Sequence, residues 1–181
     1  NQQEKTLTVR YKKNKAIRII GFAAAALIAG LIAIKTLTPY NNPDSIYQDF
    51  YKPLNAYSST TRNSANTVDP FSNAVEKYKQ GQYQVAGVMF SDLIYEDSSN
   101  ISYRFFSGLS QLELNNYEQS IQLFKEVISN NGEFQKEAKW YLGLAYIKTN
   151  DIQKASILFN ELSGEKGYYQ TMAQDLLDRI K

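Results

Sequence analysis

The side chains of this chain that could do chemistry are carboxylates, amines, phenols and hydroxyls, because its 181 residues include neither His nor Cys. Those absences exclude Cys or His zinc sites, thiolate nucleophiles, imidazole-ligated haem, Ser-His-Asp relays and disulfides. The carboxylate pairs Glu96–Asp97 and Asp175–Asp178 fall at expected helix ends or on polar faces, where a solvated role is more common than acid and base catalysis. Neither a P-loop nor a glycine-rich phosphate turn occurs. The sequence therefore predicts a protein that is not an enzyme and has no catalytic, metal or cofactor site.

The charged residues are unevenly distributed along the chain. Residues 1–35 contain seven basic residues and one acidic residue, a net charge of +6, whereas the remaining 146 residues sum to −4. A nucleic-acid binder needs its basic face on the folded domain, and here the basic residues gather at one end instead. We therefore expect protein partners and no nucleic acid.

An apolar segment near the N-terminus has the length of a membrane span. Residues 19–34 are uncharged, and Arg18 and Lys35 flank them. A helix over residues 17–37 would be about 30 Å long, which matches the hydrocarbon core of a bilayer. A cleaved signal is less consistent with the sequence because small residues at the A-x-A spacing are missing. A buried helix of a soluble fold is also less consistent, because this helix would be apolar on every face.

The charges beside this predicted transmembrane helix indicate its orientation. Five basic residues lie between Arg10 and Arg18, whereas Lys35 is the only one between there and Lys52. The positive-inside rule then makes residues 1–16 a cytoplasmic flank and, in a bacterial inner membrane, places the rest of the chain in the periplasm. Contact with lipid is expected through residues 17–37. The chain begins at Asn1, and a domain upstream of it stays an open possibility.

Residues 38–69 are predicted to be a linker that contains one apolar and aromatic stretch. Three prolines in it argue against long regular structure, and the polar residues 58–67 are typical of a mobile loop. Residues 46–57 instead carry too much apolar and aromatic surface to float in solvent. We expect this segment to dock on the lipid interface, on a partner or on the chain's own folded domain, where the first helical repeat is its expected site.

From Pro70 onward, one pattern recurs three times. Three turns, which begin at Gly81, Asn115 and Asn150, are separated by 34 and 35 residues. Each turn is followed by an aromatic or aliphatic residue, a small residue three positions later and a Phe four positions after that, at Phe90, Phe124 and Phe159. Gly and Asn adopt the left-handed conformation that ends a helix, so each unit is expected to be a helical hairpin with its small residue where the two helices cross.

These units resemble the tetratricopeptide repeat family over about 110 of the 181 residues. The third unit matches best, with Leu142-Gly143-Leu144-Ala145-Tyr146 followed by Asn150, Ala155 and Phe159. The second unit departs from the pattern at Gln111 and Ser120, the first departs at Ala74 and Lys77, and no unit has the family's closing Pro. Repeats are expected at about 70–98, 101–131 and 134–163.

The predicted fold class is all-α: one N-terminal transmembrane helix, then an α-solenoid of about three tetratricopeptide helical hairpins and a C-terminal capping helix. The expected helices of the repeat domain, residues 70–181, cover 70–80, 83–96, 101–114, 117–130, 134–148, 151–162 and 168–180. The last helix should cover one end of the stack with the stripe Tyr168, Met172, Leu176 and Ile180.

The resemblance also implies a binding groove lined by the first helix of each unit. Carried over by position, its contact stripe is Phe71, Val75, Tyr78 and Lys79, then Phe105, Leu109, Leu112 and Glu113, then Trp140, Leu144, Ile147 and Lys148. The stripe lacks the Lys, Arg and Asn set that captures a carboxylate, and its apolar character favours an amphipathic helix or an aromatic segment. Trp140, the only Trp, is the strongest candidate for partner contact. Packing between helices is the alternative role for every apolar member.

Two functional hypotheses follow. The first is a non-catalytic, membrane-anchored scaffold of the bacterial envelope, which binds a partner protein or stabilises a membrane complex, with a topology similar to that of periplasmic repeat subunits beside translocons. The second is a transmembrane regulator of the anti-sigma type, which requires a cytoplasmic domain upstream of Asn1. An enzymatic role is compatible with the sequence only if this chain is a non-catalytic subunit of a larger complex.

Overall fold

The computed structural model describes residues 42–54 and 69–180. The cytoplasmic flank 1–16, the predicted transmembrane helix with Arg18 and Lys35, and the polar stretch 58–67 lie outside the described residues. Within the described ranges, no helix has the length and apolarity needed to cross a membrane. The chain divides into two units, Asn1–Asn42 and Pro43–Lys181, and every described helix belongs to the second unit.

The described part of the second unit contains eight helices and no strand. Their bounds are α2 Pro43–Phe50, α3 Pro70–Lys79, α4 Tyr83–Glu96, α5 Ile101–Glu113, α6 Tyr117–Ser129, α7 Gln135–Lys148, α8 Ile152–Gly164 and α9 Tyr169–Ile180. The all-α class is confirmed for these residues, and α3 to α9 begin and end within two residues of the predicted helices. The sequence does not predict helix α2; it starts at Pro43, and the first position of a helix is where proline is tolerated.

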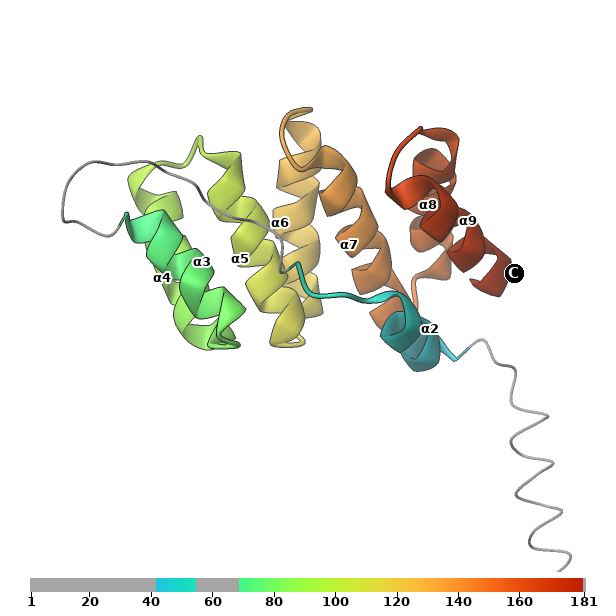
Figure 1. Cartoon of the computed structure of the whole chain (residues 1–181), viewed down its shortest axis with the longest axis horizontal. Coiled ribbons are helices and arrows are strands. Elements are labelled where there is room, and N and C mark those ends of the chain that lie inside the picture. Colours follow the sequence, from blue (N-terminus) through green and yellow to red (C-terminus); the bar gives the residue numbers. More distant parts are fainter. Residues whose placement is uncertain (1–41, 55–68, 181) are drawn as a thin grey trace, which may run out of the picture. The chain divides into compact units, whose positions relative to one another are not determined.

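Helices α3 to α8 form three antiparallel hairpins, and α9 follows them (Figure 1). The first helices α3, α5 and α7 contact one another in order and α7 contacts α9, whereas no contact joins α4 to α6 or α6 to α8 in this part of the chain. Because first helices contact the first helices of neighbouring hairpins while, among the described residues, second helices do not contact one another, the first helices line the inner side of the array. This is the arrangement of an α-solenoid.

The same turn closes all three hairpins. Gly81, Asn115 and Asn150 have φ angles of 74°, 59° and 59°. After each of them, a backbone N–H donates to the carbonyl five residues earlier, over 2.9 Å, 2.9 Å and 2.8 Å. These bonds satisfy carbonyl groups that the end of a helix leaves unpaired, so the Gly or Asn at each turn is a backbone requirement. The turn residues therefore set the boundary between the two helices of each unit.

Each hairpin crosses where a small residue meets a large ring. Ala86, Ser120 and Ala155 are fully buried, as are Phe90, Phe124 and Phe159. Ser120 stands where the family prefers Ala, and its hydroxyl donates to the Gly108 carbonyl over 2.9 Å, so the extra polar atom is satisfied. The departure from the family pattern therefore leaves no buried hydroxyl unpaired at this crossing.

Helix α9 covers the end of the array, and three of the four residues in the predicted stripe pack there: Leu176 is fully buried, and Met172 and Ile180 are partly buried against the core. It packs on α8 and α7, and its buried residues are Tyr169, Ala173, Leu176 and Leu177. Tyr168, which the sequence places in the buried stripe, is 71% exposed. The reason is that α9 starts one residue later than predicted, so Tyr168 belongs to the preceding turn rather than to the packed face.

Candidate partner-binding surface

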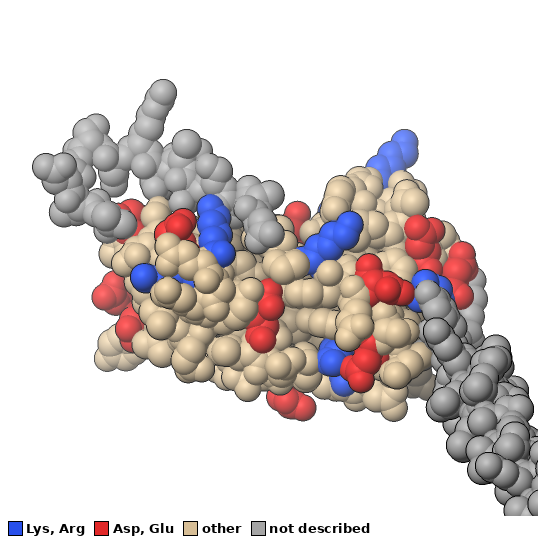
Figure 2. All heavy atoms as spheres, turned by 60° about the horizontal axis from the view of Figure 1, so that its bottom comes forward, with Lys and Arg blue, Asp and Glu red and all other residues tan. Residues whose placement is uncertain are grey.

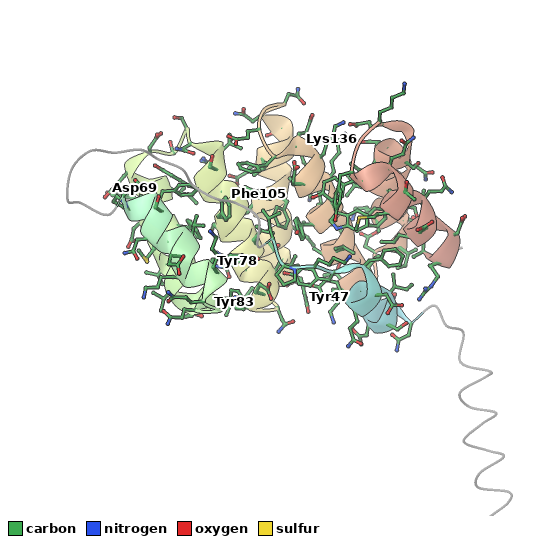
Figure 3. The ribbon with its side chains drawn as sticks, viewed as in Figure 1. Tyr47, Asp69, Tyr78, Tyr83, Phe105 and Lys136 are labelled. Carbon is green, nitrogen blue, oxygen red and sulfur yellow. The ribbon has the colours of Figure 1, made fainter. Side chains whose placement is uncertain are left out.

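Residues 43–54, here called the groove segment, lie against the first helices of the array (Figure 3). Helix α2 contacts α7 and α9, and Ile46 is only 1% exposed. The Phe50 ring meets Trp140 edge-on with centroids 6.4 Å apart, and Tyr51 meets Tyr141 at 6.1 Å. The groove segment is therefore an amphipathic helix and a short tail held by the array itself.

Two ion pairs hold α2 in place. The Lys148 ammonium lies 2.5 Å from an Asp44 carboxylate oxygen and sits over the Tyr47 ring at 5.2 Å. At the other side, Arg179 of α9 lies 2.7 Å from Asp49. Helix α2 thus docks on the third repeat and α9, where the matching cations lie, whereas the sequence predicted the first repeat; only the tail of the groove segment reaches that repeat, at Tyr78. Residues 55–57 lie outside the described residues.

Beyond α2, tyrosine hydroxyls meet one carboxylate. Tyr51 donates to Glu113 over 2.5 Å, and Tyr78 donates to the same oxygen over 3.5 Å. Tyr141 donates to the Lys52 carbonyl over 2.9 Å. Burial, followed by neighbouring tyrosines and Glu113, raises the pKa of Tyr51 above its ordinary value, and burial likewise raises the pKa values of Tyr78 and Tyr141. The tail of the groove segment thus extends from α7 towards α5 and α3, and the tyrosine hydroxyls that form its hydrogen bonds are buried and neutral.

The structure places the predicted stripe on the inner helices, but most of its residues are buried there. Eight of its members are 2% exposed or less, namely Val75, Tyr78, Phe105, Leu109, Leu112, Trp140, Leu144 and Ile147. Phe71, Glu113 and Lys148 are partly exposed and Lys79 is exposed. Lys148 and Glu113 contact the groove segment directly. Packing between helices and against the chain's own segment accounts for this burial, and contact with a partner stays a prediction for these residues.

A pocket of about 590 Å³ remains open where the groove segment ends. Its walls come from Lys52–Leu54, α7 and the start of α9, and they include the rings of Trp140, Tyr141, Tyr168 and Tyr169. Sequence reasoning found Trp140 but missed Glu137 and the two tyrosines at 168 and 169. A tyrosine doublet at the start of an expected capping helix was the available signal, because one of two adjacent residues must face away from the packed side.

The carboxylate pairs considered for catalysis have structural surroundings. Asp97 accepts hydrogen bonds from the Ser99 hydroxyl and backbone N–H over 2.6 Å and 3.0 Å, and these bonds lower the pKa of its carboxyl. Over the described ranges, no three acidic side chains are grouped closely enough to hold a metal ion.

Comparison with known families agrees with the repeated hairpins. The family model of the tetratricopeptide repeat matches residues 107–133, which run from the middle of α5 through α6 to the loop before α7. This match supports a tetratricopeptide repeat protein. No curated protein matches the chain. Tetratricopeptide repeats commonly bind partner proteins and are typically non-catalytic scaffolds.

The buried tyrosines predict how the repeat domain responds to alkaline pH. In the unfolded chain these phenols ionise near the ordinary pKa of 10.0, while burial keeps Tyr78 and Tyr141 neutral to higher pH in the fold. The contribution of these two neutral phenols to the free energy of unfolding is therefore fully present below pH 10 and is lost as the pH rises above it. At one pH unit above 10, ionisation of each of these two tyrosines in the unfolded chain lowers the free energy of unfolding by about 1.4 kcal/mol.

Parallel titrations check this expectation. Tyrosinate absorbance and the helical circular dichroism signal should change together for the buried phenols. Complete ionisation of all 14 tyrosines at unchanged helical signal would contradict it.

Proposed function

We propose that this chain is a non-catalytic, membrane-anchored scaffold of the bacterial envelope that binds a partner protein through its tetratricopeptide array on the periplasmic side. The observation that carries the proposal is the groove segment: the inner face already holds one amphipathic helix, α2, through Ile46, two ion pairs and aromatic contacts. Helix-in-groove binding is a recurrent mode of peptide recognition. A surface that binds this helix in its own chain has the chemistry to bind another polypeptide.

The charge distribution supports a protein ligand. Figure 2 shows one face of the array on which acidic and basic side chains are scattered between uncharged areas. The described residues contain 17 acidic and 11 basic side chains. A nucleic-acid ligand would require a continuous basic surface, and this face does not provide one.

The length of chain between the predicted anchor and the array supports a position close to the membrane. Five residues, 38–42, separate the predicted span from α2 at Pro43. Five extended residues span at most about 18 Å. Docking of α2 on α7 and α9 would then hold the array beside the bilayer, where it could act on a membrane complex.

Deleting residues 17–37 tests the anchor. We expect the full chain to sediment with membranes and the deletion variant to stay in the supernatant, because the remaining described helices include none that could span a bilayer. Deletion of the polar residues 58–67 is the matched control and should leave the protein in the membrane fraction. A reporter enzyme fused after Lys181 should be active in the periplasm; activity only in the cytoplasm would contradict the proposed topology.

Purification of the full chain in mild detergent tests the scaffold role. Proteins that remain bound through the washing steps identify the partner. If no other protein remains bound to the chain although its repeat domain is folded, the proposal is contradicted.

A further inference from the structure

The pocket beside the groove segment has walls of aromatic rings set at different angles. The Tyr168 and Tyr169 rings lie 5.1 Å apart at 84° to each other, and the Trp140 and Tyr169 rings lie 5.4 Å apart at 30°. Tyr168 is 71% exposed, so its ring stands at the open side, while Trp140 is only 2% exposed. Rings that meet nearly at right angles can present more than one face or edge to the same guest. A cation is attracted to an exposed aromatic face, and in this pocket the exposed ring is that of Tyr168.

A carboxylate that no basic side chain of the described residues neutralises lies in the same pocket wall. Glu137 precedes Tyr141 by one helical turn on α7, so both point to the same side of that helix. Its two lysine neighbours on α7 are bound elsewhere: Lys136 pairs with Glu165 at 3.1 Å, and Lys139 pairs with Glu161 at 2.9 Å. Glu137 itself makes no ion pair with any residue in ranges 42–54 and 69–180.

The Glu137 charge acts on the ring at the base of the pocket. Burial raises the pKa of Tyr169 above its ordinary value, and the nearby negative charge of Glu137 is the next cause. The pocket thus combines the negative charge of Glu137 with aromatic walls; Lys52 also lines it, and the described residues as a whole contain more acidic than basic side chains. The carboxylate and the aromatic walls both favour a positively charged guest.

We propose that this pocket binds a basic side chain of the partner protein, arginine in preference to lysine, with the cation against the exposed Tyr168 ring and with Glu137 as its counter-charge. Arginine is preferred because its planar guanidinium both stacks on aromatic rings and donates two parallel hydrogen bonds to a carboxylate. A volume of about 590 Å³ leaves space for the residues that flank the basic side chain. This inference rests on the proposed partner-binding function and specifies its chemistry at one site.

Fluorescence of Trp140 gives a direct test, because it is the only Trp in the chain. The full chain in mild detergent is titrated with blocked pentapeptides that differ only in a central Arg, Lys or Gln. The Arg peptide should change the fluorescence in a saturable way and bind about ten-fold more tightly than the Gln peptide, with the Lys peptide between them. Equal binding of the Arg and Gln peptides, or no binding of either, would overturn the proposal.

Two pairs of variants locate the effect. Glu137→Gln should reduce binding of the Arg peptide to the level of the Gln peptide, whereas Glu133→Gln, at an exposed position outside the pocket, should leave it unchanged. Tyr168→Ala should weaken binding about ten-fold, whereas Tyr95→Ala, at a residue that is 92% exposed on α4, should have no effect. Both pocket variants change partly or largely exposed side chains, and an unchanged helical signal verifies that they fold. Wild-type affinity in both pocket variants would overturn the assignment.

The outcome for the pocket is separable from that for the scaffold role. If partner proteins copurify with the chain but none of the peptides discriminates, only the pocket assignment fails. If no partner copurifies and the reporter is active only in the cytoplasm, the proposed function fails whatever the peptides do.

Discussion

Gly143→Ala is expected to lower the free energy of unfolding by about 1–3 kcal/mol, which is the usual cost of overpacking a core. A Cβ atom at Gly143 would lie 2.4 Å from the Phe159 ring, closer than any real contact of that kind. The ring cannot retreat, because it is fully buried and the Trp140 ring lies 5.3 Å away. The clash must also exceed the gain of about 1 kcal/mol that Ala brings to a helix relative to Gly. Urea denaturation followed by circular dichroism measures the difference.

Gly164→Ala is the matched control. Gly164 ends α8, has no positive φ, and would place its Cβ where no other atom lies within 4 Å. The same substitution should here leave the free energy of unfolding unchanged or raise it by up to about 1 kcal/mol. Equal destabilisation by both variants would mean that the close approach of α7 and α8 at Phe159 is wrong.

Ile46→Asp is expected to release the groove segment from the array. Ile46 is the buried residue of α2, and burying such a side chain contributes about 1.5–3 kcal/mol. A carboxylate at this site would lose that contribution and would also need to be desolvated without a partner. An eight-residue helix is not stable in water without its packing, so α2 should unfold once it detaches. Hydrogen exchange of residues 43–54 should then become as fast as in an unfolded peptide, while α3 to α8 stay protected.

Gln48→Asp is the control on the same helix. Gln48 is exposed, so the same new charge can be solvated there, and residues 43–54 should keep their protection. The Trp140 fluorescence should shift towards that of a solvated indole only in Ile46→Asp, because the Phe50 ring then no longer covers the Trp140 ring. Retained protection in Ile46→Asp would contradict the packing of α2 on α7.

The Ile46→Asp variant also connects the fold to the proposed function. Release of the groove segment would expose inner-face side chains that α2 and its tail now contact, such as Glu113 and Lys148. A partner that uses this same face should bind the variant more tightly than the control, whereas a partner that binds only the pocket should bind the variant less tightly, because Lys52–Leu54 form one wall of the pocket. Copurification with both variants therefore tells which surface the partner occupies.

Local features of the sequence were sufficient to predict the repeats. The turns at Gly81, Asn115 and Asn150 require a left-handed residue, and that requirement is visible in the residue type alone. Each buried Phe lies four residues after the small residue of its unit, a step of about one helical turn that places both on one face without knowledge of distant contacts. For these reasons the seven helices from α3 to α9 were predicted within two residues of their observed bounds.

The groove segment and the pocket depend on contacts between distant positions. Asp44 pairs with Lys148 across 104 residues, and Asp49 pairs with Arg179 across 130. The local pattern of residues 43–54 does not identify those partners, so the sequence predicts docking but assigns it to the first repeat, whereas α2 docks on α7 and α9. The start of α9 is a similar case: the helix begins at Tyr169, which is buried, and Tyr168 lies exposed in the preceding turn, because which of two adjacent tyrosines packs depends on contacts with other helices.

By itself, the sequence determined an all-α repeat array with its turns, crossings and core Phe residues, because those are set by helical period and by backbone conformations near each residue. Only the tertiary structure decided that the inner face already holds a helix of the same chain, and that Glu137 and four aromatic rings share one open pocket. The physical reason is that burial and ion pairing act between surfaces that meet only after the helices have packed.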